Sequence, residues 1–297
     1  MAVPLFSFPV SGSLAPQRAC GLVQLLVWGH PAAVPALHPV AGERHEMFTP
    51  ATLFRMTAES LLLAYGDLNA ADAGRLDLAC ESLGIGVDSL MEMAGEQVAR
   101  AAWMMLGEKP GAVAVVAGRG NNGGDGLVAA RNLAAWGCSV RLQLVAESEE
   151  LISARIAGRL SPLRVLCEQV VVAPALQLSG EHDIIIDALF GTGLKQSPRP
   201  AEASVIAWMA GSGSQVLCVD VPSGLDTTTG AWLAGKWPCQ AVCCLAAAKH
   251  GVWVARDAGD LESIWVADIG VPRMVWDQLA LQPPLNVVAG SLSHIPR

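Results

Sequence analysis

The sequence has no long hydrophobic run, no cluster of basic residues and no paired cysteine motif. Although 52% of its 297 residues are hydrophobic, no apolar run approaches the roughly 18 residues that a membrane-spanning helix needs. The formal net charge is −8, so the basic patch typical of a nucleic-acid-binding protein is missing. The sequence therefore predicts neither a membrane protein nor a nucleic-acid partner.

Eight cysteines are present, but none forms a Cys-x-x-Cys pair or stands at zinc-ligand spacing from a histidine. Disulfide frameworks are typical of much smaller secreted domains. Several of the cysteines fall in apolar segments, where a free thiol behaves as a small hydrophobic side chain. We therefore expect reduced, buried cysteines in a cytoplasmic protein.

The chain divides into three segments of different composition. Residues 1–46 hold six of the eighteen prolines and lack the basic start of a signal peptide, so we predict a disordered extension there. Residues 51–280 carry the periodic apolar pattern of a folded domain. Residues 281–297, which include Pro283 and Pro284, are predicted to be a linker-like tail.

Helical signals dominate between residues 51 and 106. Leu76, Ala79 and Leu83 are spaced three and four apart, as on one apolar helix face. A further helix is expected after Gly86, with Asp88 or Ser89 as its N-cap.

Strands and helices then alternate along the chain. The predicted strands are residues 112–117, 139–145, 164–172, 183–189, 215–221, 241–247 and 263–267, and the predicted helices between them are 126–137, 147–160 and 200–211. Continuous apolar strands separated by helices are typical of a parallel sheet covered on both faces. The predicted fold class is α/β: a Rossmann-like three-layer sandwich with a mostly parallel sheet, preceded by N-terminal helices. In such sheets, ligands bind beyond the carboxyl ends of the strands.

The first predicted strand leads into a glycine-rich segment, residues 118–126, which reads Gly-Arg-Gly-Asn-Asn-Gly-Gly-Asp-Gly. It fits the G-x-G-x-x-G pattern of a dinucleotide loop, in which the backbone approaches a phosphate at a helix start. That pattern alone also fits a dehydrogenase, with Glu147 near the position for a ribose, or a plain tight turn. Asp125 is unusual there, because a carboxylate beside a phosphate needs a compensating charge.

Three further strand ends carry polar side chains. Asp187 ends the fourth strand and Asp220 the fifth, where Pro222-Ser223-Gly224 follows; Lys249 comes after the sixth. Each residue also has a simpler interpretation, as a turn cap, a turn residue or a surface lysine. With the glycine-rich segment, they would bring amide, carboxylate and hydroxyl oxygens to one sheet edge. Such oxygens suit a hard cation, which would offset acidic side chains beside a bound pyrophosphate.

Five motifs occur in a characteristic order: Asn-Asn-Gly-Gly-Asp-Gly (121–126), Asp-Ala-Leu-Phe-Gly-Thr-Gly-Leu (187–194), Asp-Val-Pro-Ser-Gly-Leu-Asp (220–226), Lys-x-Gly (249–251) and Ala-Asp-Ile-Gly-Val-Pro (267–272). In these motifs the chain resembles the YjeF N-terminal domain family, whose enzymes are NAD(P)H-hydrate epimerases. Residues 90–95, Leu-Met-Glu-Met-Ala-Gly, resemble the family's second-helix motif.

The resemblance implies a homodimeric enzyme that interconverts the R and S epimers of NADHX and NADPHX, the damaged hydrates of reduced nicotinamide cofactors. A partner dehydratase would then repair the S form. It implies a potassium ion held through Asn122, Asp187 and Ser223. It also implies substrate contacts at a larger set of positions: Asn121, Asn122, Gly123, Gly124, Asp125, Gly191, Thr192, Gly193, Leu194, Lys195, Gln196, Ser197 and Asp220.

Asp220 and Lys249 are the candidates for the chemistry, with Asp125 as an alternative acid–base group. Epimerisation at C6 of the hydrated ring requires reversible loss and return of a hydroxyl, or ring opening, with proton transfers. Asp220 is the candidate general acid–base, because a strand-end carboxylate in a crevice can have a tuned pKa; Asp125 is the second choice. Lys249 is expected to orient Asp220 or a phosphate.

Alternatives to this interpretation differ in class. The same fold also occurs in non-catalytic binding and scaffold modules, and an ordinary NAD-dependent dehydrogenase would use only the glycine-rich segment. The tail from Ser293 resembles just the entry to the dehydratase domain that many bacterial relatives carry, so we expect no dehydratase activity from this chain.

Overall fold

The computed structural model describes residues 57–237 and 239–296. The extension predicted at residues 1–46 lies outside the described residues. No helix within the described part of the chain is both long and apolar enough to cross a membrane.

Eight strands form one sheet in the order β3-β2-β1-β4-β5-β6-β7-β8. All neighbouring strands are parallel except β7 and β8, which pair antiparallel. The strands are β1 (Ala112–Ala117), β2 (Ser139–Leu144), β3 (Gln169–Val172), β4 (Ile184–Ala188), β5 (Gln215–Val219), β6 (Cys239–Leu245), β7 (Leu261–Ala267) and β8 (Leu292–Pro296). The chain runs outward from β1 to β3 and then returns to β4 on the other side of β1. This reversal opens a crevice at the carboxyl ends of β1 and β4, where doubly wound sheets bind ligands.

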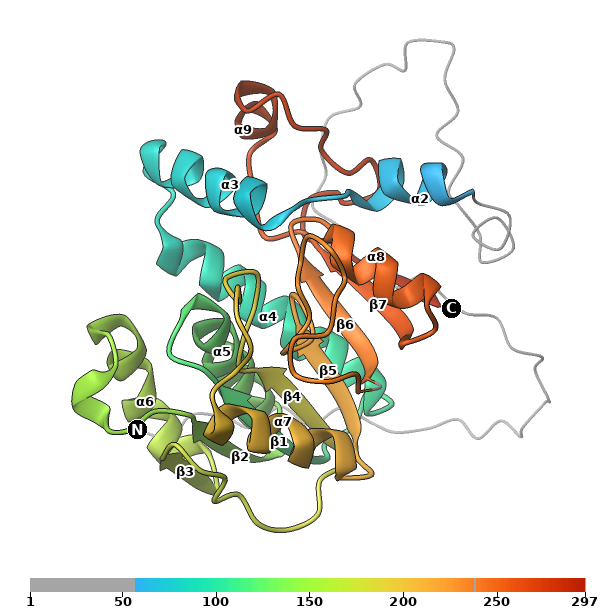
Figure 1. Ribbon diagram of the computed structural model, residues 1–297. Helices are drawn as coiled ribbons and strands as arrows, with labels where there is room; N and C mark the ends of the chain where they lie inside the picture. The colour runs from blue at the N-terminus through green and yellow to red at the C-terminus, as the bar shows by residue number, and fades with distance from the viewer. Residues whose placement is uncertain (1–56, 238, 297) are drawn as a thin grey trace, which may run out of the picture. The chain divides into compact units, whose positions relative to one another are not determined.

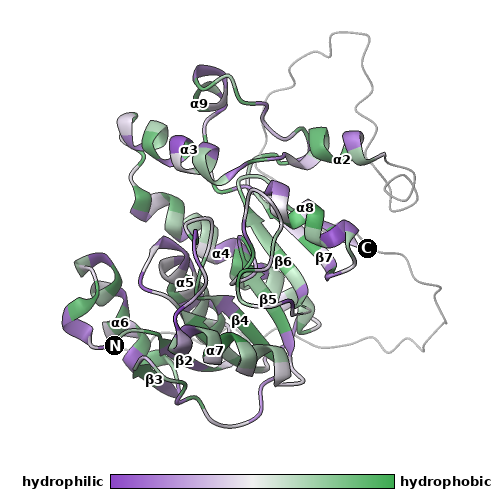
Figure 2. Cartoon of the chain, in the orientation of Figure 1, coloured by the Kyte–Doolittle hydropathy of each residue, from purple (hydrophilic) through white to green (hydrophobic). Residues whose placement is uncertain are grey.

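Helices cover both faces of the sheet (Figure 1). Val113 and Val115 of β1 contact the core beneath α3, α4, α5, α6 and α9, whereas Ala114 and Val116 contact the core beneath α2, α7 and α8. Because both faces are buried, the central strands are mostly hydrophobic (Figure 2). The helices are α2 (Ala58–Tyr65), α3 (Ala70–Ser82), α4 (Val87–Met105), α5 (Asn121–Ala135), α6 (Ala154–Leu166), α7 (Pro200–Gly211), α8 (His250–Asp257) and α9 (Arg273–Gln278). The predicted three-layer fold with preceding helices is confirmed.

Helix α5 begins earlier than the sequence predicted. It starts at Asn121 instead of Gly126, so the polar insert forms the first turns of the helix and is not a loop. Glycine is needed there because the helix packs closely on two strand ends. A Cβ atom on Gly123 would lie 1.8 Å from the Gly118 carbonyl oxygen, and one on Gly126 would lie 2.4 Å from Cβ of Ala188. These contacts fix Asn121, Asn122 and Asp125 relative to β1 and β4.

Two further local predictions were wrong. The strand predicted at 164–172 is divided, because α6 continues to Leu166 and β3 begins only at Gln169. Ile156, Leu160 and Leu163 bury one face of α6, while Val165 is 84% exposed, so the apolar run belongs partly to a helix. Helix α4 starts at Val87 after Gly86, without a side-chain cap.

The tail also differs from the linker predicted at 281–297. Strand β8 pairs with β7, with Ile295 opposite Ile264. The Asp268 carboxylate accepts hydrogen bonds from the backbone N–H groups of Gly270, at 3.0 Å, and Gly290, at 2.7 Å. The tail therefore covers the open edge of β7 and completes the sheet.

Candidate active site

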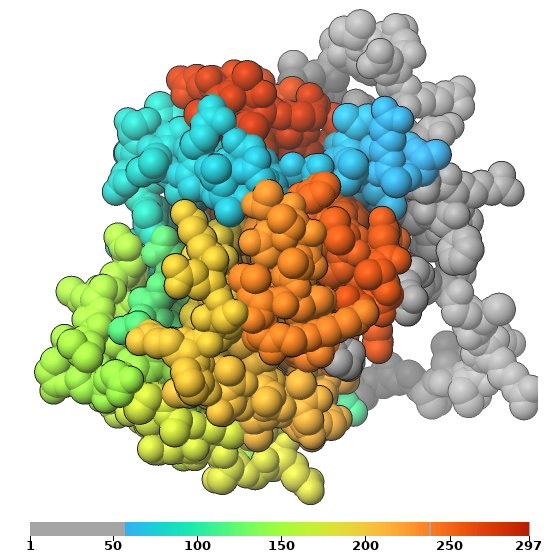
Figure 3. All heavy atoms as spheres, viewed as in Figure 1, coloured from blue at the N-terminus to red at the C-terminus, as the bar shows by residue number. Residues whose placement is uncertain are grey.

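A cavity of about 810 Å³ opens at the carboxyl ends of the central strands. In Figure 3, the residues after β4, in yellow, lie at the surface between α3, in cyan, and the orange segments that follow β5 and β6. Most positions expected to contact substrate line this cavity: Asn121, Asn122, Asp125, Asp220 and the whole run from Gly191 to Ser197. Gly123 and Gly124 do not line it, because they pack against Gly118 and Met91.

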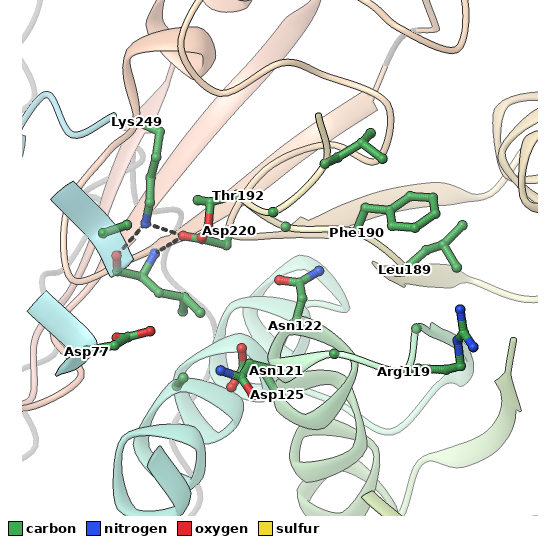
Figure 4. Close-up of a pocket in the computed structure, with 18 of the residues that line it drawn as sticks. Asp77, Arg119, Asn121, Asn122, Asp125, Leu189, Phe190, Thr192, Asp220 and Lys249 are labelled. Carbon is green, nitrogen blue, oxygen red and sulfur yellow. Dashed lines mark hydrogen bonds and ion pairs between the residues drawn. The ribbon is translucent and has the colours of Figure 1, made fainter. Parts of the chain in front are cut away.

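Asp220 and Lys249 form an ion pair at the strand side of the cavity (Figure 4). Lys249 Nζ donates to Asp220 Oδ1 and, at 2.6 Å, to the Leu245 carbonyl oxygen. Leu245 N–H also donates to Asp220 Oδ1, at 3.0 Å. Lys249 is only 2% exposed and Asp220 9%, so the surface-lysine alternative is wrong. The second carboxylate oxygen, Oδ2, accepts no hydrogen bond from the described residues and remains available.

The backbone explains why Asp220 faces the cavity. Strand β5 ends at Val219, and Asp220 has a φ angle of 65°. This left-handed conformation is unfavourable for aspartate and costs about 1–3 kcal/mol. The Asp220 N–H still bonds the Cys243 carbonyl oxygen of β6, at 2.7 Å. The strained residue is therefore held in place by β6 and by Lys249.

Asp187 and Ser223 form a second polar centre, buried behind the cavity. Asp187 Oδ1 accepts from Ser223 Oγ at 2.6 Å and from Leu189 N–H at 3.2 Å, and Oδ2 accepts from Ser223 N–H at 2.8 Å. Burial raises the pKa of Asp187, and the hydrogen bonds from Ser223 and Leu189 oppose this rise. The structure thus brings together two of the three residues predicted to bind a cation.

Asn122 lies against Gly191, in the segment that follows β4. Its Oδ1 atom is 2.9 Å from the position that a Cβ atom on Gly191 would occupy. The buried Nδ2 atom of Asn122 donates no hydrogen bond to a described residue. Rotating the side-chain amide so that its oxygen points into the protein would therefore break no hydrogen bond of Nδ2. The described residues contain no group of three His, Cys, Asp or Glu side chains suited to a metal. The donors at this position are neutral oxygens and one carboxylate, which fit a hard cation such as potassium.

Asp125 differs from both other aspartates. It is only 7% exposed and lines the cavity, yet no described residue donates a hydrogen bond to its carboxylate. Burial raises the pKa of Asp125 well above its usual value, and the negative charges of Asp220 and Asp77 add to the rise. Burial and neighbouring negative charges therefore both favour the protonated form of Asp125.

The structure also places in the cavity several residues that the sequence interpretation missed. Arg119 and Arg199 line it, as does Lys195. Arg199 is paired with Glu202 at 3.0 Å, which leaves Arg119 and Lys195 as cations suited to phosphate. Asp77 on α3 also lines the cavity. Arg119 directly follows the first glycine of the glycine-rich segment and could have been chosen from the sequence. For Asp77 no local signal existed.

Glu147 does not line the main cavity. It lines a separate space of about 50 Å³ that shares Arg119, Arg199 and Glu202 with the main cavity. The carboxylate that would bind a ribose in an ordinary dinucleotide site therefore lies apart from Asp220 and Lys249.

Comparisons with known proteins agree with these features. Residues 87–251, more than half of the chain, match the family described as YjeF-related protein N-terminus. An NAD(P)H-hydrate epimerase from Dehalogenimonas lykanthroporepellens is 34% identical over 69% of this chain and 82% of its own length. One from Pirellula staleyi is 32% identical over 70% of this chain and 93% of its own length.

Other relatives are much longer. A bifunctional NAD(P)H-hydrate repair enzyme from Thermofilum pendens is 43% identical over 51% of this chain, but the match covers only 30% of that enzyme. The chain thus spans about a third of the length of such relatives. A solved yeast protein structure has the same fold, with a TM-score of 0.66 and 23% identity over 76% of this chain and 98% of its own. The chain belongs to the YjeF-related N-terminal domain family.

Proposed function

We propose that this protein is an NAD(P)H-hydrate epimerase that interconverts the R and S epimers of NADHX and NADPHX. The buried Asp220–Lys249 pair beside the cavity is the observation that carries the proposal. The names of the relatives support it. A volume of about 810 Å³ falls within the range of small-molecule and cofactor sites.

The chemistry assigned to Asp220 follows from its contacts. Lys249 and Leu245 N–H occupy one carboxylate oxygen and leave the other facing the cavity. A carboxylate fixed in this way can remove a proton from the C6 hydroxyl, or return one, without first having to reorient. Lys249 has the role of a positioning residue, because its ammonium group is turned toward Asp220 and the Leu245 carbonyl oxygen.

The opposite end of the cavity would hold the phosphates. Helix α5 starts there without a side-chain cap, so its first backbone N–H groups are free to donate. Arg119 and Lys195 add positive charge. A potassium ion held by Asn122, Asp187 and Ser223 would add further charge beside the pyrophosphate and orient the ring.

The cellular setting is also part of the proposal. We infer a homodimer in the cytoplasm that acts with an ADP- or ATP-dependent dehydratase, which removes water from the S epimer. The seven cysteines in the described part of the chain are free thiols, and all but Cys167 are buried. Such unpaired cysteines support a reducing compartment.

One assay distinguishes this enzyme from a non-catalytic module of the same fold. The purified protein is incubated with R-NADHX and an S-specific dehydratase, and the return of NADH absorbance is followed. An epimerase accelerates this return above the spontaneous rate. A folded protein that leaves the rate unchanged would favour the scaffold alternative.

A further inference from the structure

Carboxyl groups face the cavity from two different walls. Asp220 comes from the strand side, together with Lys249 (Figure 4). Asp77 comes from α3 and Asp125 from α5, so both belong to the helical side. Asp77 lies before residues 87–251, which match the family, and the function proposed above gives it no role.

The helical wall differs from the strand wall in its hydrogen bonding. Asp220 is held by Lys249 and by a backbone N–H. No described residue donates a hydrogen bond to the carboxylate of Asp77 or to that of Asp125. Asp125 is nevertheless more than nine-tenths buried, whereas Asp77 is an exposed residue that lines the cavity. These two carboxyl groups are thus available to a ligand.

The charges in the cavity favour a proton on the helical wall. Of the three carboxyl groups Asp77, Asp125 and Asp220, only Asp220 bonds Lys249. Burial raises the pKa of Asp77, the charge of Asp220 raises it further, and Lys249 opposes the rise. Burial and the charge of Asp220 also raise the pKa of Asp125, and the positive charges of Lys249 and Arg159 oppose that rise. A proton on Asp77 or Asp125 would therefore lie across the cavity from the Asp220–Lys249 ion pair.

Epimerisation of a hydroxyl-bearing carbon has a geometric requirement that this arrangement meets. When the hydroxyl leaves from one face of the ring and returns to the other, each face needs its own proton donor or acceptor. We propose that Asp77 is the second acid–base group, serving the ring face that points away from Asp220. This inference rests on the proposed epimerase function.

The step can be written with all atoms balanced. On one face the C6–O bond breaks, its electron pair stays on oxygen, and Asp77 gives that oxygen a proton so that water leaves. The lone pair of N1 forms an N1=C6 bond. Water then adds to the other face, the N1=C6 electron pair returns to N1, and Asp220 takes the proton. The reverse reaction exchanges the two roles, and Asp125 lies close enough to both for their charges to raise its pKa.

The test compares Asp77→Asn with wild type in the coupled NADHX assay. We expect kcat to fall at least about 100-fold, within the range for loss of an acid–base group, while KM changes little. The pH–rate profile should lose the limb that belongs to Asp77. Asp77→Glu should restore part of the activity with that limb shifted. Glu81→Gln is the matched control, since it removes a charge from the same helix outside the cavity.

The outcomes separate this inference from the proposed function. A folded wild-type protein without epimerase activity overturns both. An active wild type together with a fully active Asp77→Asn variant, or an unchanged pH profile, overturns only the role of Asp77. If Asp77→Asn does not fold, Asp77→Glu decides: an unaltered kcat and pH profile then counts against the inference.

Discussion

An aspartate lies at the carboxyl end of each of the strands β4 and β5, at the same edge of the sheet. The two aspartates differ in their hydrogen bonds and backbone conformation. Asp187 lies within β4, and three donors from Ser223 and Leu189 occupy its carboxylate. Asp220 follows the end of β5 in a left-handed conformation, bonds Lys249 and keeps one oxygen free. The hydrogen bonds of Asp187 stabilise the fold, whereas Asp220 keeps a carboxylate oxygen that is able to react.

The difference shows that the backbone after a strand decides what its terminal carboxylate can do. A residue that stays in the strand folds its side chain beneath the next loop. A residue forced into the left-handed region turns its side chain toward the cavity, at a cost of about 1–3 kcal/mol. Four measurements test whether Asp187 and Asp220 differ in this way.

The largest expected effect is that of Asp220→Asn on turnover. Removing the acid–base group should lower kcat by about 10²–10⁴-fold, while KM stays close to the wild-type value. Circular dichroism should show an intact fold, and Asp226→Asn, in the following turn, serves as the control. If kcat fell less than about 10-fold, well below that range, Asp220 would be a structural residue like Asp187.

Asp187→Ala should act mainly on stability. It leaves the backbone N–H groups of Leu189 and Ser223 without their acceptor, while the Ser223 hydroxyl keeps a long contact of 3.4 Å with the Phe190 carbonyl oxygen. Each unsatisfied buried group costs about 1–3 kcal/mol. We expect the free energy of unfolding, measured in urea, to drop by about 2–4 kcal/mol. Ser223→Ala removes only the hydroxyl and should cost less. Equal losses for the two variants would contradict the assigned hydrogen bonds.

Asp125→Asn tests a third aspartate, which has neither the hydrogen bonds of Asp187 nor the lysine partner of Asp220. Burial raises the pKa of Asp125 in the folded protein. Above about pH 4, the folded protein therefore binds more protons than the unfolded chain. The free energy of unfolding consequently falls as the pH rises above that value. The variant should therefore be more stable than wild type at pH 8, and this advantage should disappear at pH 3. Denaturation at both pH values measures this, with exposed Asp257→Asn as control. A parallel pH dependence in variant and wild type would refute it.

Potassium should have the smallest effect on stability, and this effect should require Asp187 but not Asp220. At a potassium concentration equal to Kd, binding raises the free energy of unfolding by RT ln 2, about 0.4 kcal/mol, relative to an ion that does not bind. Melting curves in potassium and sodium chloride measure the difference. It should vanish in Asp187→Ala and persist in Asp220→Asn. The reverse pattern would place the cation beside Asp220.

Much of the sheet could be predicted because its strands are short, apolar and bounded by turn residues. Ile184–Ile186 and the valines of β1 admit no other element in that context. The predictions failed where a local pattern was ambiguous. The apolar residues from Val165 to Val172 fit a strand as well as a helix end, and only the packing of Leu160 and Leu163 decides between them.

The candidate site was predictable to the extent that it follows the strands. Asp187, Asp220 and Lys249 lie at carboxyl ends, where a parallel sheet gathers its functional groups. Burial of Lys249 could not be read from the sequence, since it depends on the Leu245 carbonyl oxygen and on Asp220. Asp77 was missed because its position depends on how α3 packs across the cavity.

Helix α3 has a consequence for how relatives of this protein should be compared. Leu68, Leu76 and Asp77 line the cavity from before residue 87, and Ile269 and Val271 do so from after residue 251. A fragment limited to the matched residues would retain the glycine-rich helix start, both strand-end aspartates and the lysine, but its cavity would lack one side. Two proteins with identical motifs could therefore differ in substrate choice or activity through their amino-terminal helices alone.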